Sequence, residues 1–300
     1  MTGLRDLSTF ASYHPIINFS YFVLVIGISM TSLNPWFLAC SFASAFAYTI
    51  ILKGKKVVKF NILFIIPLVL ISALLNMLFI HDGETILFYM YENAVTLEAL
   101  LYGFVIGFML SGMMLWLMCY QEIVTSDKFI YLFGRILPTL ALTISMIFRY
   151  IPLLRKRFVE ITEGQRCMGR DFKSGSLIKR LHQAAKEVSI LIAWSLEASI
   201  ETSDSMEARG YGIMGRSSFN LFVFTKNDAK LLAIIAGLGA LVLAGMFMGK
   251  TTIYYYPATF FLDQDIISYI TYFLYLCLLV LPIVVDIGGE LRWRQLRLKM

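Results

Sequence analysis

Six long apolar runs dominate this chain of 300 residues, and each approaches the length needed to cross a lipid bilayer. A spanning helix needs about 20 mostly apolar residues, because its backbone polar groups must be satisfied within the hydrocarbon layer. The runs are residues 15–32, 35–52, 58–80, 97–120, 230–249 and 266–287. Hydrophobic residues make up 58% of the sequence and charged residues only 15%, against about a quarter in a typical soluble domain. The pattern excludes a soluble globular protein, a disordered chain and a disulfide scaffold. It predicts an all-α polytopic membrane protein with about six transmembrane helices.

Basic residues are distributed unevenly between the segments that connect these runs. If the amino terminus is cytoplasmic, the inner segments carry 25 of the 26 Lys and Arg residues, and only Lys250 falls outside. These inner segments are residues 1–14, 53–59, 121–230 and 288–300. Because Lys and Arg accumulate in cytoplasmic loops, this distribution predicts that both termini are cytoplasmic.

Two further stretches, residues 136–153 and 188–200, are apolar enough to be considered as additional spans. If both crossed the membrane, the strongly basic segment 154–187 would lie outside the cell, against the charge distribution. We therefore expect both stretches to form amphipathic or buried helices on the cytoplasmic side. An extra pair of spans is the alternative.

The predicted spans offer little chemistry. Glu98 and Asp286 are expected at helix ends, within reach of the membrane interface, where ionisable groups are tolerated. Gly103, Gly107 and Ser111 lie four residues apart, which favours close packing between helices. The sequence contains no recognisable catalytic or metal-binding motif, and its four cysteines lack metal-ligand spacing. We therefore interpret the spans as a scaffold, with no catalytic residue, cofactor or metal.

The segment 121–229 is far longer than the two to eight residues that usually connect bundled helices. The sequence thus predicts three regions. They are a four-helix membrane bundle at 1–120, cytoplasmic coupling helices at 121–229, and two transmembrane helices with a basic tail at 230–300.

Helical periodicity predicts two helices in this cytoplasmic insert. The first extends from Phe129 to Cys167 and is expected to be broken by Pro138 and Pro152, because proline cannot donate a backbone hydrogen bond. The second extends from Ser176 to Arg209.

Each of these helices ends in a short motif that contains glycine. In Ala208-Arg209-Gly210, the glycine stands where a left-handed residue commonly stops a helix, and Arg209 occupies the last turn. A guanidinium there is favoured by the helix dipole and can reach past the helix end toward a carboxylate on a partner. The motif Gln165-Arg166-Cys167-Met168-Gly169-Arg170 has the same layout.

With these motifs in place, the sequence resembles the transmembrane T component of energy-coupling factor (ECF) transporters, the CbiQ/EcfT-like family. That family carries two Ala-Arg-Gly motifs at the ends of two cytoplasmic coupling helices, the first typically preceded by Gln-Arg. Here the second motif is complete. In the first, Gln165, Arg166 and Gly169 are in place, but Met168 occupies the arginine position. Arg166 or Arg170 could substitute for the missing arginine.

The resemblance implies a non-catalytic, energy-coupling subunit in the cell membrane of a prokaryote, serving vitamin or metal-ion uptake. It implies two ABC-type ATPase partners and a separate substrate-binding membrane subunit, the S component, packed against the apolar spans. The residues expected to bind the ATPases are Gln165, Arg166, Met168, Gly169, Arg170, Ala208, Arg209 and Gly210.

Three other functions fit the sequence less well. A conventional ABC permease domain, lining its own substrate path, is the nearest alternative. A lipid-modifying membrane enzyme would need paired acids or a metal motif. Nucleic acid is not an expected partner, because residues 121–230 carry 16 basic and 11 acidic residues, a net charge typical of an ordinary inside loop.

Overall fold

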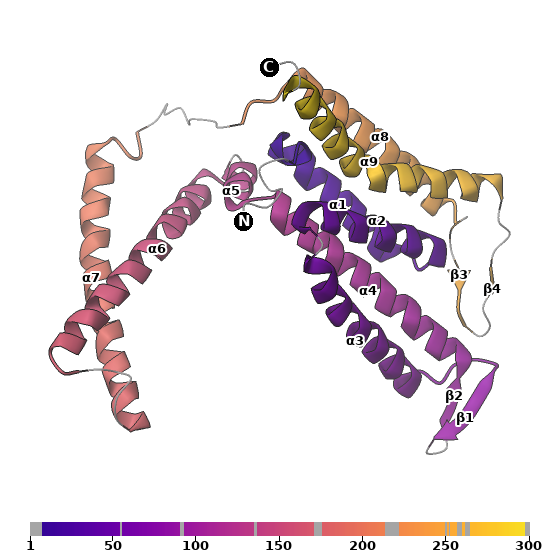
Figure 1. Ribbon diagram of the computed structural model, residues 1–300, viewed down its shortest axis with the longest axis horizontal. Coiled ribbons are helices and arrows are strands. Elements are labelled where there is room, and N and C mark those ends of the chain that lie inside the picture. The colour runs from indigo at the N-terminus through magenta and orange to yellow at the C-terminus, as the bar shows by residue number, and fades with distance from the viewer. Residues whose placement is uncertain are drawn as a thin grey trace. The chain divides into compact units, whose positions relative to one another are not determined.

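The computed structural model describes residues 8–54, 56–90, 93–134, 137–170, 176–213, 222–249, 251, 253–256, 260–261 and 265–297. The chain is all-α and polytopic, as predicted, with two short β-hairpins added (Figure 1). The helices are η2 (Phe10–Ser12), α1 (Pro15–Thr31), α2 (Pro35–Lys53), α3 (Lys56–Phe79), α4 (Leu97–Ile123), α5 (Ser126–Gly134), α6 (Pro138–Cys167), α7 (Leu177–Ala208), α8 (Lys226–Phe247) and α9 (Ile266–Arg297). The strands are β1 (Ile86–Met90), β2 (Asn93–Thr96), β3 (Ile253–Tyr254) and β4 (Phe260–Phe261).

The six predicted runs coincide with six apolar helices. Among the residues that the structure describes, α2, α3, α4, α8 and α9 are long and apolar enough to cross a membrane. Helix α1 is equally apolar but has 17 residues, about 25 Å of helix against a hydrocarbon layer of about 30 Å. Neither α6 nor α7 qualifies as a span within the described segments, which agrees with the expectation for 136–153 and 188–200. Lys250 lies outside the described residues.

The tight turn between α1 and α2 follows from local sequence. Both helices have proline at the first helical position, where its missing N–H costs nothing and its fixed φ suits the helix. The residue before each proline caps the helix with its side chain: His14 Nδ1 accepts from Ile16 N, and Asn34 Oδ1 accepts from Trp36 N.

The chain forms two compact units. The first comprises residues 1–129 and 222–300, and the second comprises residues 130–221. An aromatic core joins α1, α2, α4 and α9 in the first unit, with Tyr21, Tyr48, Trp116 and Tyr275 fully buried. Trp116 satisfies its buried N–H by donating to Ser41 Oγ at 3.0 Å. Tyr21 Oη donates to Leu279 O and Tyr48 Oη donates to Asp286 Oδ2, so three of these four large side chains pair their polar group inside the core.

The predicted face of small residues on α4 is confirmed, and its partner is α3 of the same chain. A Cβ added at Gly103 would lie 2.7 Å from Ala73 Cα, and one at Gly107 would lie 2.9 Å from Val69 Cα. Ser72 Oγ also donates to the Gly103 carbonyl at 3.0 Å. Such close backbone approach is how membrane helices gain packing energy without a hydrophobic driving force between them.

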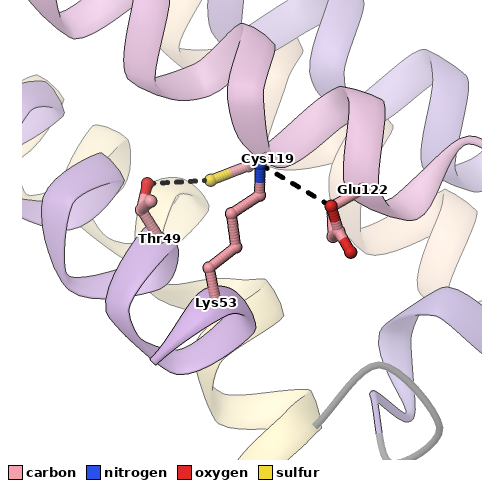
Figure 2. Close-up of polar contacts among 4 residues, drawn as sticks. All are labelled: Thr49, Lys53, Cys119 and Glu122. Carbon is pink, nitrogen blue, oxygen red and sulfur yellow. Dashed lines mark hydrogen bonds and ion pairs between the residues drawn. The ribbon is translucent and has the colours of Figure 1, made fainter. Parts of the chain in front are cut away.

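Polar contacts join the last turns of α2 and α4 (Figure 2). The Thr49 hydroxyl and the Cys119 thiol share a buried hydrogen bond of 3.3 Å. One turn further along, Lys53 Nζ pairs with Glu122 Oε2 at 3.6 Å, with about a quarter of each side chain exposed. An ion pair of this exposure contributes at most about 1 kcal/mol.

Two expectations are corrected by the structure. Pro152 does not break the first predicted helix of the insert, because α6 continues through it to Cys167. Proline lacks a backbone N–H, and a helix of 30 residues tolerates the loss of that one hydrogen bond. Pro138 does mark a boundary, since α5 ends at Gly134 and α6 begins at the proline.

Asp286 is not at a helix end, because α9 continues to Arg297, and its side chain is only 6% exposed. Glu98 does lie in the first turn of α4, where it is buried and accepts a 2.6 Å hydrogen bond from Thr85 Oγ1.

Candidate functional site

The second unit is built from the long helices α6 and α7, which pack as an antiparallel pair (Figure 1). Four polar or cation–π contacts join them, and residue numbers fall along α7 as they rise along α6. In order, they are Tyr150 Oη with Thr202 Oγ1 at 2.7 Å, the Arg157 guanidinium over the Trp194 ring at 4.9 Å, Thr162 Oγ1 to Glu187 Oε2 at 2.9 Å, and Gln183 Nε2 to Gln165 Oε1 at 3.3 Å. The carboxyl ends of the two helices therefore lie at opposite ends of the pair.

A groove of about 570 Å³ lies between the two helices, and its lining residues show which part of α6 the end of α7 adjoins. Arg209, at the end of α7, lines this groove together with Leu142, which lies near the start of α6. Leu142 precedes Cys167, the last residue of α6, by roughly 25 residues, or about 37 Å of helix. Two separate proteins could therefore engage the two ends without competing for space.

The end of α7 is a Schellman turn. Tyr211 N donates to Met206 O at 3.0 Å, and Gly210 N donates to Glu207 O at 2.9 Å. Gly210 has φ of +77°, in the left-handed region that suits glycine, as predicted from the sequence. Arg209 is the C-cap residue, with φ of −86° and ψ of 8°.

The end of α6 repeats this turn. Arg170 N donates to Gln165 O at 2.9 Å, and Gly169 N donates to Arg166 O at 2.9 Å. Gly169 has φ of +73°, and the C-cap residue is Met168, with φ of −85° and ψ of 11°. Met168 therefore occupies the same backbone position as Arg209, as the sequence comparison of the two motifs predicted.

Most of the candidate residues are at the surface. Ala208, Arg209, Arg166, Gly169 and Arg170 are exposed, and Met168 is 60% exposed. Gln165 differs: its side chain is buried against α7 and accepts from Gln183. It therefore positions the end of α6 instead of projecting from it.

The two ends differ in the side chains that surround them. The first turns of α7, which lie beside the end of α6, expose Leu177, Ile178 and Leu181 at 75–83%. At the other end, Arg209 lines the groove together with Arg149 and Glu201. The end of α6 therefore has exposed leucine and isoleucine side chains beside its exposed arginines, whereas the end of α7 adjoins a groove that contains two arginines and a carboxylate. Sequence reasoning identified the motifs but missed this difference, which the antiparallel pairing creates.

Comparisons with known proteins agree with this geometry. The family model described as cobalt transport protein (CbiQ) matches residues 16–221, which include both helix ends. The chain is 38% identical over 105 residues to the energy-coupling factor transporter transmembrane protein EcfT of Lactobacillus helveticus, an alignment covering 35% of this chain and 38% of that protein. It is 36% identical over 116 residues to EcfT of Bacillus selenitireducens, covering 38% and 43%. It is 28% identical over 214 residues to EcfT of Bacillus subtilis, covering 65% and 75%.

The first two of these alignments span less than half the length of the relatives concerned, whereas the family model covers more than two thirds of this chain. The apolar helices, the two glycine-terminated ends of α6 and α7 and these matches agree with one another. The chain belongs to the CbiQ family of multi-pass membrane proteins, the transmembrane T components of energy-coupling factor transporters.

Proposed function

We propose that this chain transmits ATP-driven motion from two cytoplasmic ABC-type ATPases to a separate substrate-binding subunit in the membrane. The observation that carries the proposal is the pair of matching helix ends. Two exposed Schellman turns of nearly identical geometry stand at opposite ends of one antiparallel helix pair. Repetition of one structure at two places fits a chain that binds two related partners.

Each helix end would occupy a groove on one ATPase. At α7, the guanidinium of Arg209 would form charge-assisted, bidentate hydrogen bonds with a carboxylate of its partner. At α6, the exposed side chain of Met168 and the neighbouring leucine and isoleucine residues would supply apolar contact, while Arg166 or Arg170 would supply charge. The proposed ATPase-binding residues are thus Arg166, Met168, Gly169, Arg170, Ala208, Arg209 and Gly210, with Gln165 holding the end of α6 in position.

The membrane bundle would hold the substrate-binding subunit. Helix α3 is the most apolar of the candidate spans, and only 11% of its span is buried within the chain, against 28–44% for the others. An exposed apolar helix of this kind suits packing against lipid or against helices of another membrane protein. The transported compound would then be recognised by that subunit.

On this proposal the chain itself is not an enzyme, and ATP hydrolysis belongs to its partners. The distribution of Lys and Arg supports a place in the cell membrane with both termini in the cytoplasm.

Affinity purification of the tagged chain from its native membrane tests the proposal. We expect two ABC-type ATPases and a small membrane protein to copurify, identified by mass spectrometry. Recovery of the folded chain alone would contradict the proposal, and crosslinking of a transported compound to this chain would favour a permease that lines its own path.

A further inference from the structure

The segment that precedes α1 contacts three helices far apart in the sequence. Residues 8–14 lie within the first unit, between α5, α8 and α9. The second unit, residues 130–221, is called the coupling unit below. Helix α5 includes the last residues before the chain enters this unit, and α8 begins shortly after the chain returns to the first unit at residue 222. The segment therefore contacts both places where the coupling unit is attached.

The contact with α9 is made by a buried carboxylate. Asp286 Oδ1 accepts from Phe10 N at 2.7 Å and from Ser8 Oγ at 3.4 Å, and its Oδ2 accepts from Tyr48 Oη at 3.2 Å. Phe10 itself is fully buried in the aromatic core. A carboxylate inside a membrane protein is costly unless it is hydrogen-bonded, so these contacts hold the segment at one position.

The contact with α5 uses a lysine whose three N–H groups are all satisfied. Lys128 Nζ donates to Ala11 O and to Ile123 O at 3.0 Å. With the Asn18 side-chain amide turned so that both its oxygen and its nitrogen have partners, Lys128 Nζ also donates to Asn18 Oδ1 at 2.9 Å. Burial lowers the pKa of Lys128 to about 8, so the side chain is mostly protonated at neutral pH. The lysine joins the segment to α1 and to the last turn of α4 at the point where the chain leaves the first unit.

The contact with α8 lies on the returning chain. Asp228 Oδ1 accepts from His14 N at 3.3 Å, while its Oδ2 accepts from Thr225 N at 2.8 Å and from Thr225 Oγ1 at 2.7 Å in a capping box. The His14 and Phe224 rings meet edge to face, with centroids 5.2 Å apart. The same segment thus fixes the first turn of α8.

We infer that residues 8–14 form a clamp that holds both attachment points of the coupling unit against the membrane bundle, with Asp286, Lys128 and Asp228 as its positioning residues. The mechanical consequence of the clamp rests on the proposed function. Motion of the helix ends moves the membrane bundle only if the attachment points stay fixed to the bundle. If the attachment points move instead, the coupling unit turns without moving the bundle, and ATP is hydrolysed without transport.

Hydrogen exchange of the purified full-length chain in lipid nanodiscs tests the clamp without any partner. Within the described residues, the hydrogen bonds of Asp286 to this segment lie at its start, at residues 8–10. We expect Asp286→Ala to speed exchange at least tenfold in residues 126–134 and 222–228, which the carboxylate does not touch. Asp286→Asn, which keeps an acceptor for Phe10 N, should restore most of the protection. Faster exchange confined to residues 8–12 and α9, or no change, would overturn the inference.

Lys128→Met is a second variant, which removes the contact of the segment with α5 instead of its contact with α9. It tests the clamp even if Asp286→Ala does not fold. It should speed exchange at least tenfold in 222–228, and unchanged exchange there would overturn the clamp. Lys53→Met is the matched control, because it removes a partly exposed lysine and its ion pair to Glu122 without touching the clamp (Figure 2).

The consequence for coupling is measured with the complex that copurifies with the chain, reconstituted in liposomes. In Lys128→Met, ATP hydrolysis should stay within twofold of wild type while uptake falls at least tenfold; in Lys53→Met, both should stay within twofold. A parallel loss of hydrolysis and uptake, or unchanged uptake, would contradict a role in coupling. If the wild-type chain captures no ATPase, the proposed function fails, while the exchange result still decides whether the clamp exists.

Discussion

The ends of α6 and α7 share one backbone turn and differ in the side chain that the turn presents. Both close with the same pair of hydrogen bonds and a left-handed glycine, and their C-cap residues agree within a few degrees in φ and ψ. At that C-cap position one helix has Met168 and the other has Arg209. The backbone at each end is therefore determined by the glycine, while the chemistry offered to a partner is set by one neighbouring residue and by the helix that packs alongside.

The largest effect should come from reversing the charge at the arginine end. We expect Arg209→Glu to reduce uptake to background, about 100-fold or more, with the chain still inserted in the membrane. A carboxylate would repel an acidic partner groove and is also unfavourable at a helix carboxyl end; about 3 kcal/mol gives this factor. Uptake assays and immunodetection in membranes measure both quantities.

Arg155→Glu is the matched control, because Arg155 is exposed in the middle of α6 and undergoes the same change of charge. Normal uptake in Arg209→Glu, or an equal loss in Arg155→Glu, would show that the helix end has no special role.

A smaller effect should follow from placing a negative charge at the C-cap of α6. We expect Met168→Glu to weaken retention of one ATPase by about tenfold, because burying an apolar side chain of this size contributes roughly 1.5 kcal/mol and a carboxylate would forfeit it. Quantitative mass spectrometry of the purified complex gives the ratio of the two ATPases. Equal loss of both ATPases would indicate that the two ends do not bind separate partners.

The two glycines offer a test of the shared turn. Alanine in the left-handed region costs roughly 1–2 kcal/mol, so Gly169→Ala and Gly210→Ala should each speed exchange of the amide that closes the turn by about fivefold or more. The effect should be larger at Gly210, because a Cβ there would lie 2.9 Å from Ile213 Cδ1, whereas nothing lies within 4 Å at Gly169. Hydrogen exchange at Tyr211 and Arg170 measures the two turns. The opposite ranking would contradict the structural comparison.

The smallest effect should come from making the two C-cap residues alike. We expect Met168→Arg to keep uptake within twofold of wild type, because the side chain is exposed and a cation is favourable at a helix carboxyl end. Loss of complex assembly in this variant would show that the end of α6 has a specialised partner, which would sharpen the difference between the ends.

The sequence was sufficient to predict the fold class, the six apolar helices and both glycine-terminated ends. Bilayer thickness demands long apolar runs, and few residues other than glycine adopt a left-handed helix stop, so these features are local in the chain. The second coupling helix was predicted at residues 176–209 and is observed at Leu177–Ala208, with Ser176 and Arg209 as its caps. Pro152 was misjudged because the cost of one lost hydrogen bond is spread over a long helix, which a local rule does not take into account.

The surroundings of these local features depend on how the folded chain packs. Asp286 looked like an interfacial carboxylate until the folded chain brought Phe10, Ser8 and Tyr48 to it. Gln165 looked like part of a partner-binding motif until α7 covered its side chain. Similarly, the exposed leucine and isoleucine side chains near the end of α6 and the groove beside Arg209 follow from antiparallel pairing, which places the start of each helix beside the end of its neighbour. The physical reason is that hydrogen bonds between residues hundreds of positions apart leave no periodic trace in the sequence, whereas helix length, hydrophobicity and backbone stops do.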